Sequence, residues 1–158
     1  MQSTANILTT LNDVLTGELT AINHYFLHAR MFKNWGLEGL NNKAYKKSIK
    51  NMKQADDLIE RILMLEGLPN LQKLESLQVG EHAEEMLKLD VVFETKHIER
   101  VKKAIVVCES EKDFVSRGIL ESILESAEDY FDWLDTQHHL IKTTGIENYL
   151  QSQISEEE

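Results

Sequence analysis

The sequence predicts an all-α protein: a bundle of four long helices, a long crossover connection after the second helix, and a short fifth helix at the C-terminal end. One proline and seven glycines in 158 residues leave few interruptions, which favours long helices over strands and turns. Apolar residues recur at three- and four-residue steps along four segments, the spacing of one helical face. This length suits one domain with its own core, so we expect residues 1–158 to form a single domain, with a frayed acidic tail at 155–158.

The first two helices are predicted at about Thr4 to Asn34 and Leu40 to Glu66. Trp35-Gly36 is a typical end for the first helix, and Gly67-Leu68-Pro69-Asn70 is a typical end for the second. The apolar stripe of the first helix comprises Leu8, Leu11, Leu15, Ile22, Tyr25 and Ala29.

The connection from about Leu71 to Gly80 is longer than most turns between bundle helices, so it predicts a crossover. The third helix follows at about Glu81 to Cys108. Ser110 followed by Asp113 can cap the fourth helix.

The fourth helix is predicted to run to about Thr143, where Gly145 breaks the chain before a fifth helix at about Ile146 to Ile154. Four long helices with one long connection after the second match a ferritin-like bundle. A cytokine-like bundle has two long crossovers and fits less well.

Composition narrows the possible partners. The net charge of -10 argues against nucleic acid and anionic membrane surfaces and suits metal cations. A single cysteine, Cys108, excludes an internal disulfide and fits a reducing cytoplasm. The polar stretch from Met1 to Asn12 does not resemble a signal peptide, and we expect no membrane span.

Two carboxylates fall on predicted core faces: Glu18 on the first helix and Glu94 on the third. An isolated buried carboxylate is costly, so it normally has a metal, a cation or a proton beside it. The pattern therefore predicts a present or ancestral metal site, and the alternative is a pair of partly exposed structural acids.

The second and fourth predicted helices lack metal ligands at the positions where a di-iron bundle has them. A di-iron bundle site uses Glu-x-x-His on one helix, and the pairs three apart here are Asn51/Gln54 and Ala127/Tyr130. Neutral amides, a methyl group and a phenol cannot replace carboxylate and imidazole in holding two iron ions.

Second apolar stripes occur on the first two helices, which predicts burial against a partner or a ligand. Met52 is central to the stripe on the second helix. From spacing alone, methionine in such a stripe is a packing residue. The stripe residues are Leu19, Ile22, Phe26, Tyr45, Ile49, Met52, Ile59 and Leu63.

Several segments together match one known family: Leu15–Asn23, Tyr25–Met31, Ala55–Asp56, Leu58–Leu63, Leu65–Leu71, Asp132–Leu134, Thr136–Gln137 and Asn148–Ile154. Through them the sequence resembles the bacterioferritins over nearly its whole length. The resemblance implies a hollow cage of 24 subunits, identical or paralogous, that stores iron as ferric mineral. It also implies one haem b per two subunits at two-fold interfaces, held by Met52 from each subunit. The pocket would be Leu19, Ile22, Phe26, Tyr45, Ile49 and Ile59.

The resemblance also implies what this chain lacks. Glu18 and Glu94 match two ferroxidase glutamates, whereas Asn51, Gln54, Ala127 and Tyr130 replace four of six ligands. The chain thus resembles the haem-binding subunit type that works beside a catalytic subunit. Lys46 and Lys50 stand where some relatives place inner-surface iron ligands.

Three questions stay open from the sequence alone. A ferroxidase with rearranged ligands and a purely structural bundle compete with the haem-binding, iron-storing subunit. His24 and His28, one turn apart, could bind zinc, although a structural role is favoured. The region from Leu68 to Glu85 could dock a small ferredoxin reductant or be a plain surface loop.

Overall fold

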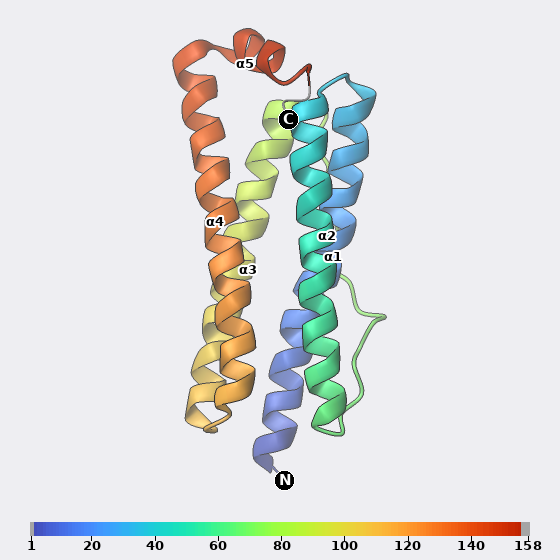
Figure 1. The fold of residues 1–158 in the computed structure, drawn as a ribbon, viewed down its shortest axis with the longest axis vertical. Helices are drawn as coiled ribbons and strands as arrows, with labels where there is room; N and C mark the ends of the chain where they lie inside the picture. The colour runs from blue at the N-terminus through green and yellow to red at the C-terminus, as the bar shows by residue number, and fades with distance from the viewer. Residues whose placement is uncertain (1, 156–158) are drawn as a thin grey trace.

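The computed structural model describes residues 2–155, and the regular structure within them is helical throughout (Figure 1). The predicted all-α bundle is confirmed, and each predicted helix end lies within two residues of the observed one. The helices are α1 (Gln2–Asn34), α2 (Glu38–Met64), α3 (Ala83–Ser110), α4 (Phe114–Thr144) and α5 (Ile146–Ser152).

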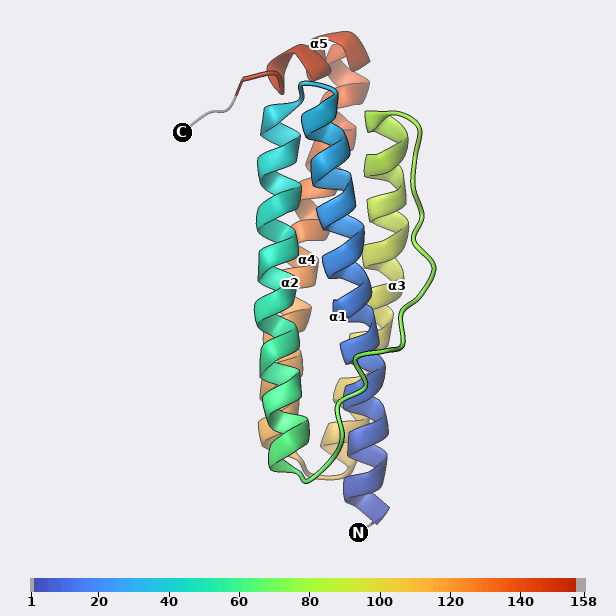
Figure 2. The same cartoon turned by 90° about the vertical axis from the view of Figure 1, so that its right-hand side faces the viewer.

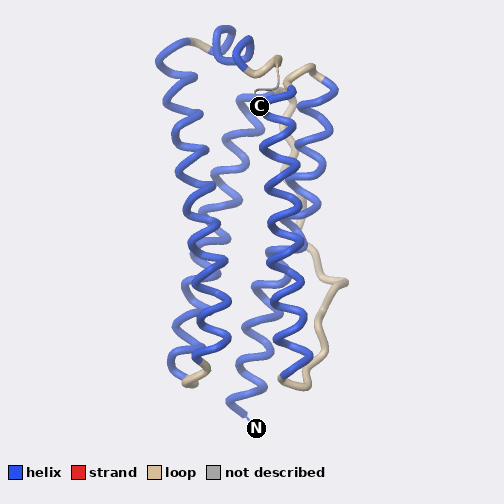
Figure 3. The backbone as a smooth tube through the Cα atoms, in the orientation of Figure 1, coloured by secondary structure: helices blue, strands red, loops and turns tan. Residues whose placement is uncertain are grey.

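The four long helices lie along one axis, with α1 packed mainly on α2 and α3 mainly on α4. Because α2 and α3 run in the same direction, the chain must return along the bundle between them. Figure 2 shows this crossover passing over the outside of α1, and it is the longest loop in Figure 3. The short α5 lies across one end of the bundle (Figure 1).

Most helix ends follow the sequence signals. Gly36 and Gly145 adopt the left-handed conformation, with φ of 78° and 85°, after α1 and α4 respectively. Of the predicted capping residues, Asp113 caps α4, because its side chain accepts a hydrogen bond from the backbone of Ser116, whereas Ser110 is the last residue of α3. After α2 the left-handed residue is Glu66, not Gly67. Gly67 is needed for space instead, because a Cβ there would overlap the Leu8 side chain.

The core is divided into two apolar clusters. One is built from the half of the bundle nearest α5, with Tyr25 and Phe32 among its largest residues. The other is built from the opposite half, with Leu11 and Leu58. On each of α1, α2 and α3, buried polar residues lie in sequence between the two clusters. A polar layer inside a core is costly, so its composition is informative about function.

Across residues 2–155, none of the helices is both long enough and apolar enough to cross a bilayer. Of the predicted tail at 155–158, Ser155 lies in an exposed bend, and residues 156–158 fall outside the described part of the chain.

Candidate functional site

The polar layer contains the two carboxylates that the sequence placed on core faces. Glu18 on α1 and Glu94 on α3 both have 0% of their surface exposed, so the predicted burial is confirmed. Buried carboxylates require donors or cations around them. The structure gives each one a different set of partners.

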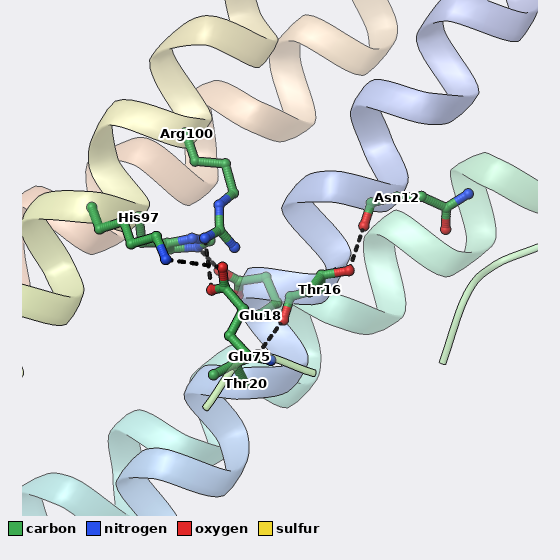
Figure 4. A network of polar contacts seen from close by, with 8 residues as sticks. Asn12, Thr16, Glu18, Thr20, Glu75, His97 and Arg100 are labelled. Carbon is green, nitrogen blue, oxygen red and sulfur yellow. Dashed lines mark hydrogen bonds and ion pairs between the residues drawn. The ribbon is translucent and has the colours of Figure 1, made fainter. Parts of the chain in front are cut away.

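Glu18 is held by an amide and an imidazole. Asn51 Nδ2 donates a hydrogen bond of 3.0 Å to Oε1, and His97 Nε2 lies 2.5 Å from Oε2. Figure 4 shows His97 reaching from α3 to Glu18. The absence of a side chain at Gly17 makes this possible, because a Cβ there would overlap the His97 ring and the Arg100 guanidinium. Both carboxylate oxygens of Glu18 are therefore engaged by protein groups.

Glu94 is held by a phenol and an ammonium group. The Tyr25 hydroxyl donates a hydrogen bond to Oε2. Lys47 Nζ lies 4.0 Å from Oε1, which makes an ion pair but no hydrogen bond. The Lys47 side chain is only 5% exposed, and its ammonium lies 5.0 Å from the centre of the Tyr130 ring. The phenol that bonds Glu94 thus belongs to Tyr25, and each carboxylate has a basic side chain beside it: His97 at Glu18 and Lys47 at Glu94.

The two phenols remain protonated. Burial raises the pKa of Tyr25 well above its usual value, and the charges of Glu94 and Asp90 raise it further. Burial, with Asp90 and Glu94, acts in the same direction on the pKa of Tyr130. A tyrosinate ligand for iron is thus disfavoured at Tyr130.

All four residues that the resemblance aligned with ferroxidase ligands are buried: Asn51 and Gln54 in the polar layer of α2, and Ala127 and Tyr130 on α4. Within the described residues, both amide atoms of Gln54 and the Oδ1 atom of Asn51 have no hydrogen-bond partner. Buried amides without partners are unusual in stable cores. These atoms of Asn51 and Gln54 therefore mark a buried polar region of α2 without hydrogen-bond partners.

A cavity of about 420 Å³ opens beside this layer, between α2 and α4. Four lysines line it, together with Ser122, Glu125, Ser126, Asp129 and Tyr130; the lysines are Lys43, Lys46, Lys47 and Lys50. Burial lowers the pKa of Lys43, and the neighbouring Lys46 and Lys47 lower it further. The approach to Glu94 from this side is therefore lined with positive charge.

The carboxylates do not form a cluster of metal ligands. Within residues 2–155, one group of three or more His, Cys, Asp or Glu side chains brings its ligand atoms within 4.8 Å of one another. That group is His24, His28 and Asp90, not Glu18 or Glu94.

The second apolar stripe faces outward, as expected. Met52 is 50% exposed, and Phe26 and Tyr45 are 48% and 40% exposed beside it on α1 and α2. The rings of Phe26 and Tyr45 contact each other, with centres 6.3 Å apart. Leu19, Ile22, Ile49 and Ile59 are half-buried along the same two helices.

Three important residues were not identified from the sequence: Lys47, Asp90 and His97. Asp90 and His97 did carry a signal, because they lie four residues before and three residues after Glu94, on the same helical face. Lys47 carried none, since a lysine near an apolar stripe usually extends to solvent.

Comparison with known proteins agrees with this architecture. The ferritin-like domain family matches residues 8–144. "Bacterioferritin" of Mycolicibacterium paratuberculosis is 39% identical over 149 residues, covering 94% of each chain. "Bacterial ferritin" of Synechocystis sp. is 41% identical over 156 residues, covering 98% of this chain and all of the relative. "Bacterial ferritin" of Pseudomonas aeruginosa is 41% identical over 155 residues. The chain belongs to the bacterioferritin family, the iron-storage branch of the ferritin-like proteins.

Proposed function

We propose that this chain is a haem-binding bacterioferritin subunit that stores iron without oxidising it at an intact di-iron centre. One observation carries the proposal. At the position where a di-iron bundle would hold two ferrous ions, the Lys47 ammonium lies 4.0 Å from Glu94. The resemblance to haem-binding subunits with four substituted ligands supports the same function.

Lys47 opposes iron in two ways. It neutralises the Glu94 carboxylate, and it repels a cation that approaches. Two unit charges 4 Å apart interact by about 4 kcal/mol at the effective dielectric of a protein near its surface, and a divalent ion would feel roughly twice that repulsion. The three further lysines around the cavity act in the same direction and outnumber its two carboxylates, Glu125 and Asp129. Ferrous iron should therefore not accumulate beside Glu94.

The remaining ligands cannot hold a pair of ions. Glu18 supplies one carboxylate, but His97 and Asn51 already engage it. Fast ferroxidation needs two irons close together, each with several anionic or imidazole ligands. We expect iron to be oxidised at catalytic subunits of the same cage.

The rearranged ferroxidase is the second candidate, and one observation favours it. Glu94 and His97 recreate the Glu-x-x-His spacing on α3. The structure pairs His97 with Glu18 rather than with Glu94, so the two do not act as one chelating pair. The haem-binding subunit without its own ferroxidase is therefore preferred.

The outward stripe fits haem chemically. A half-exposed thioether, Met52, lies among apolar and aromatic side chains on the exposed face of α1 and α2. Thioether sulfur is an established axial ligand of haem iron, and the apolar surround suits the porphyrin. Bound haem would supply one-electron transfer; Met52 would hold it, with Leu19, Ile22, Phe26, Tyr45, Ile49 and Ile59 around it. A second copy of the stripe, from a subunit across a two-fold axis, would cover the other face.

Bacterioferritins assemble into cages of like subunits, and we propose a 24-subunit cytoplasmic cage of identical or paralogous chains. The crossover supports docking of a small ferredoxin that delivers electrons through the haem. Its exposed apolar side chains are Leu68, Leu71, Leu74, Leu77 and Val79.

The haem assignment is tested by Met52→Leu, which preserves packing but removes the sulfur. The wild-type cage, mixed with haemin, should acquire a sharp Soret band at one haem per two subunits. Met52→Leu should lose that band. The control is Met64→Leu, because Met64 is 71% exposed on α2 but outside the stripe. Full haem occupancy in Met52→Leu would refute the assignment.

A further inference from the structure

A second buried polar cluster lies between α1 and α3, apart from Glu18 and Glu94. It consists of His24 and His28 on α1 and Asp90 on α3, which are 1%, 0% and 1% exposed. The two histidines are one turn apart and share a helical face. This is the spacing at which two histidines of one helix bind zinc in metalloproteases.

The three side chains converge on one point. His24 Nε2 lies 2.6 Å from Asp90 Oδ1, and His28 Nδ1 lies 2.9 Å from the same oxygen. All three ligand atoms lie within 4.8 Å of one another. In a tetrahedral zinc site, ligands about 2.0–2.2 Å from the ion lie about 3.3 Å apart. Opening the two contacts by about 0.5 Å would make room for the ion.

His28 is not satisfied by its protein surroundings. Its Nε2 faces the Gln78 carbonyl oxygen at 3.2 Å and can donate a hydrogen bond there. A neutral ring then has a lone pair on Nδ1. Although Nδ1 lies 2.9 Å from Asp90 Oδ1, the geometry is not that of a hydrogen bond, and among the described residues Nδ1 has no hydrogen-bond partner. Asp90 Oδ2 also lacks one.

A lone pair and a carboxylate oxygen facing each other in a dry core repel unless a proton or a metal ion lies between them. The Gln78 carbonyl orients the imidazole in the way that outer hydrogen bonds orient histidines bound to metals. We propose that His24, His28 and Asp90 bind a divalent transition-metal ion of the zinc type, as a structural site that joins α1, α3 and the crossover.

The ligand set selects the class of ion. Two imidazoles and one carboxylate suit zinc, cobalt or ferrous iron better than magnesium or calcium, which prefer oxygen ligands. The surroundings are apolar on one side, where the Phe93 ring stacks on His24 with centres 5.0 Å apart. Because Gln78 belongs to the crossover, the ion would also fix that segment against the bundle.

The test uses the metal-free, haem-free cage and Co²⁺ as a spectroscopic probe. Wild type should gain the visible d–d bands of a low-coordinate Co²⁺ site with nitrogen ligands, saturating at one ion per subunit. Zinc should displace the cobalt, since zinc binds such sites more tightly. His24→Gln and His28→Gln should each lose the bands. His139→Gln is the matched control, because that histidine is exposed on α4.

Two outcomes overturn the proposal. The first is a wild-type cage that shows no d–d bands and no rise in melting temperature with zinc. The second is a set of bands that persists in His28→Gln but disappears in His97→Gln, which would place the ion at Glu18. If the variants do not fold, zinc-edge anomalous diffraction from zinc-soaked wild-type crystals decides the question. A peak between the three side chains is expected, and its absence contradicts the site.

Discussion

At the scale of single residues, Lys47 is the most informative side chain in the bundle. A lysine that is 5% exposed must be paired, and Glu94 is the paired carboxylate. Removing one member of a buried ion pair leaves an uncompensated charge, whereas removing both can be nearly neutral. Removing Lys47 alone should therefore lower the free energy of unfolding, which removing a surface lysine would not do.

The first prediction concerns this pair. Lys47→Gln should destabilise the subunit by about 3 kcal/mol, because Glu94 is left as a buried anion. Lys47→Gln with Glu94→Gln should recover most of that loss. Chemical denaturation of the two single variants and the double variant measures the coupling. Additive losses in the double variant would show that the two groups do not interact.

The second residue-scale prediction concerns Cys108. The pKa of its thiol is raised to about 11, mainly by burial and also by the charge of Asp113, while Arg61 opposes the rise. Little thiolate is present at neutral pH, and the side chain is 0% exposed. A thiol-specific reagent should therefore modify the native protein slowly and the unfolded chain quickly. Fast labelling of the folded cage would show that the α3 end opens.

At the scale of elements, the sequence predicted the helices well because each long segment had regular apolar spacing and a clear break. Gly36 and Gly145 stop helices, and Asp113 caps one, for reasons that are local in sequence. Contacts across helices were less predictable. His97 reaches Glu18 on another helix only because Gly17 has no side chain, and that depends on the register of α1 against α3.

In the polar layer, too, features of a single helix were predictable and contacts between helices were not. Glu18 and Glu94 were predicted because charge on an apolar face is visible in one helix at a time. The partners of these acids could not be predicted, because rotamers decide whether Lys47 turns inward or extends to solvent. Asp90 completes a cluster with His24 and His28 only when two helices are aligned.

The crossover gives a pH-dependent prediction at this scale. Glu75 accepts hydrogen bonds from Arg100 at 2.7 Å and Lys96 at 3.1 Å, while its backbone N–H donates to Thr20 Oγ1 (Figure 4). Burial raises the pKa of Glu75, but the hydrogen bonds and charges of Arg100 and Lys96 outweigh it, so the pKa is lowered overall. Its stabilising effect is then complete above the usual pKa of 4.5 and is lost as pH falls through the lowered value.

The measurement is the melting temperature of wild type and Glu75→Gln as a function of pH. Wild type should be more stable at pH 7, and the difference should vanish in acid. Glu109→Gln is the control, because Glu109 pairs with Arg117 at 3.3 Å while its side chain is 61% exposed. A difference between wild type and Glu75→Gln that does not change with pH would contradict the role given to the carboxylate.

At the scale of the whole molecule, the bundle separates two tasks. The outer face of α1 and α2 presents Met52 among apolar side chains, while the bundle interior buries Lys47, Asn51 and Gln54 beside Glu18 and Glu94. Under the proposed function, a cage built from such subunits would keep a route for electrons and a cavity for mineral. Oxidation of incoming iron would then depend on other subunits.

This division also predicts what would restore the lost activity. Asn51→Glu, Gln54→His, Ala127→Glu and Tyr130→His supply the missing family ligands. Lys47 would still lie beside Glu94, so we expect the four substitutions to act fully only when Lys47→Gln is added. Stopped-flow iron oxidation compares the two variants. Equal rates with and without Lys47→Gln would show that the ammonium does not block iron.

The central claim is tested most directly by stopped-flow oxidation in air of two ferrous ions per subunit, added to a metal-free cage of this chain alone. The account predicts slow oxidation without a rapid phase, because neither ion finds a full set of ligands. A rapid phase that saturates at two ferrous ions per subunit would demonstrate a working di-iron centre and contradict the account.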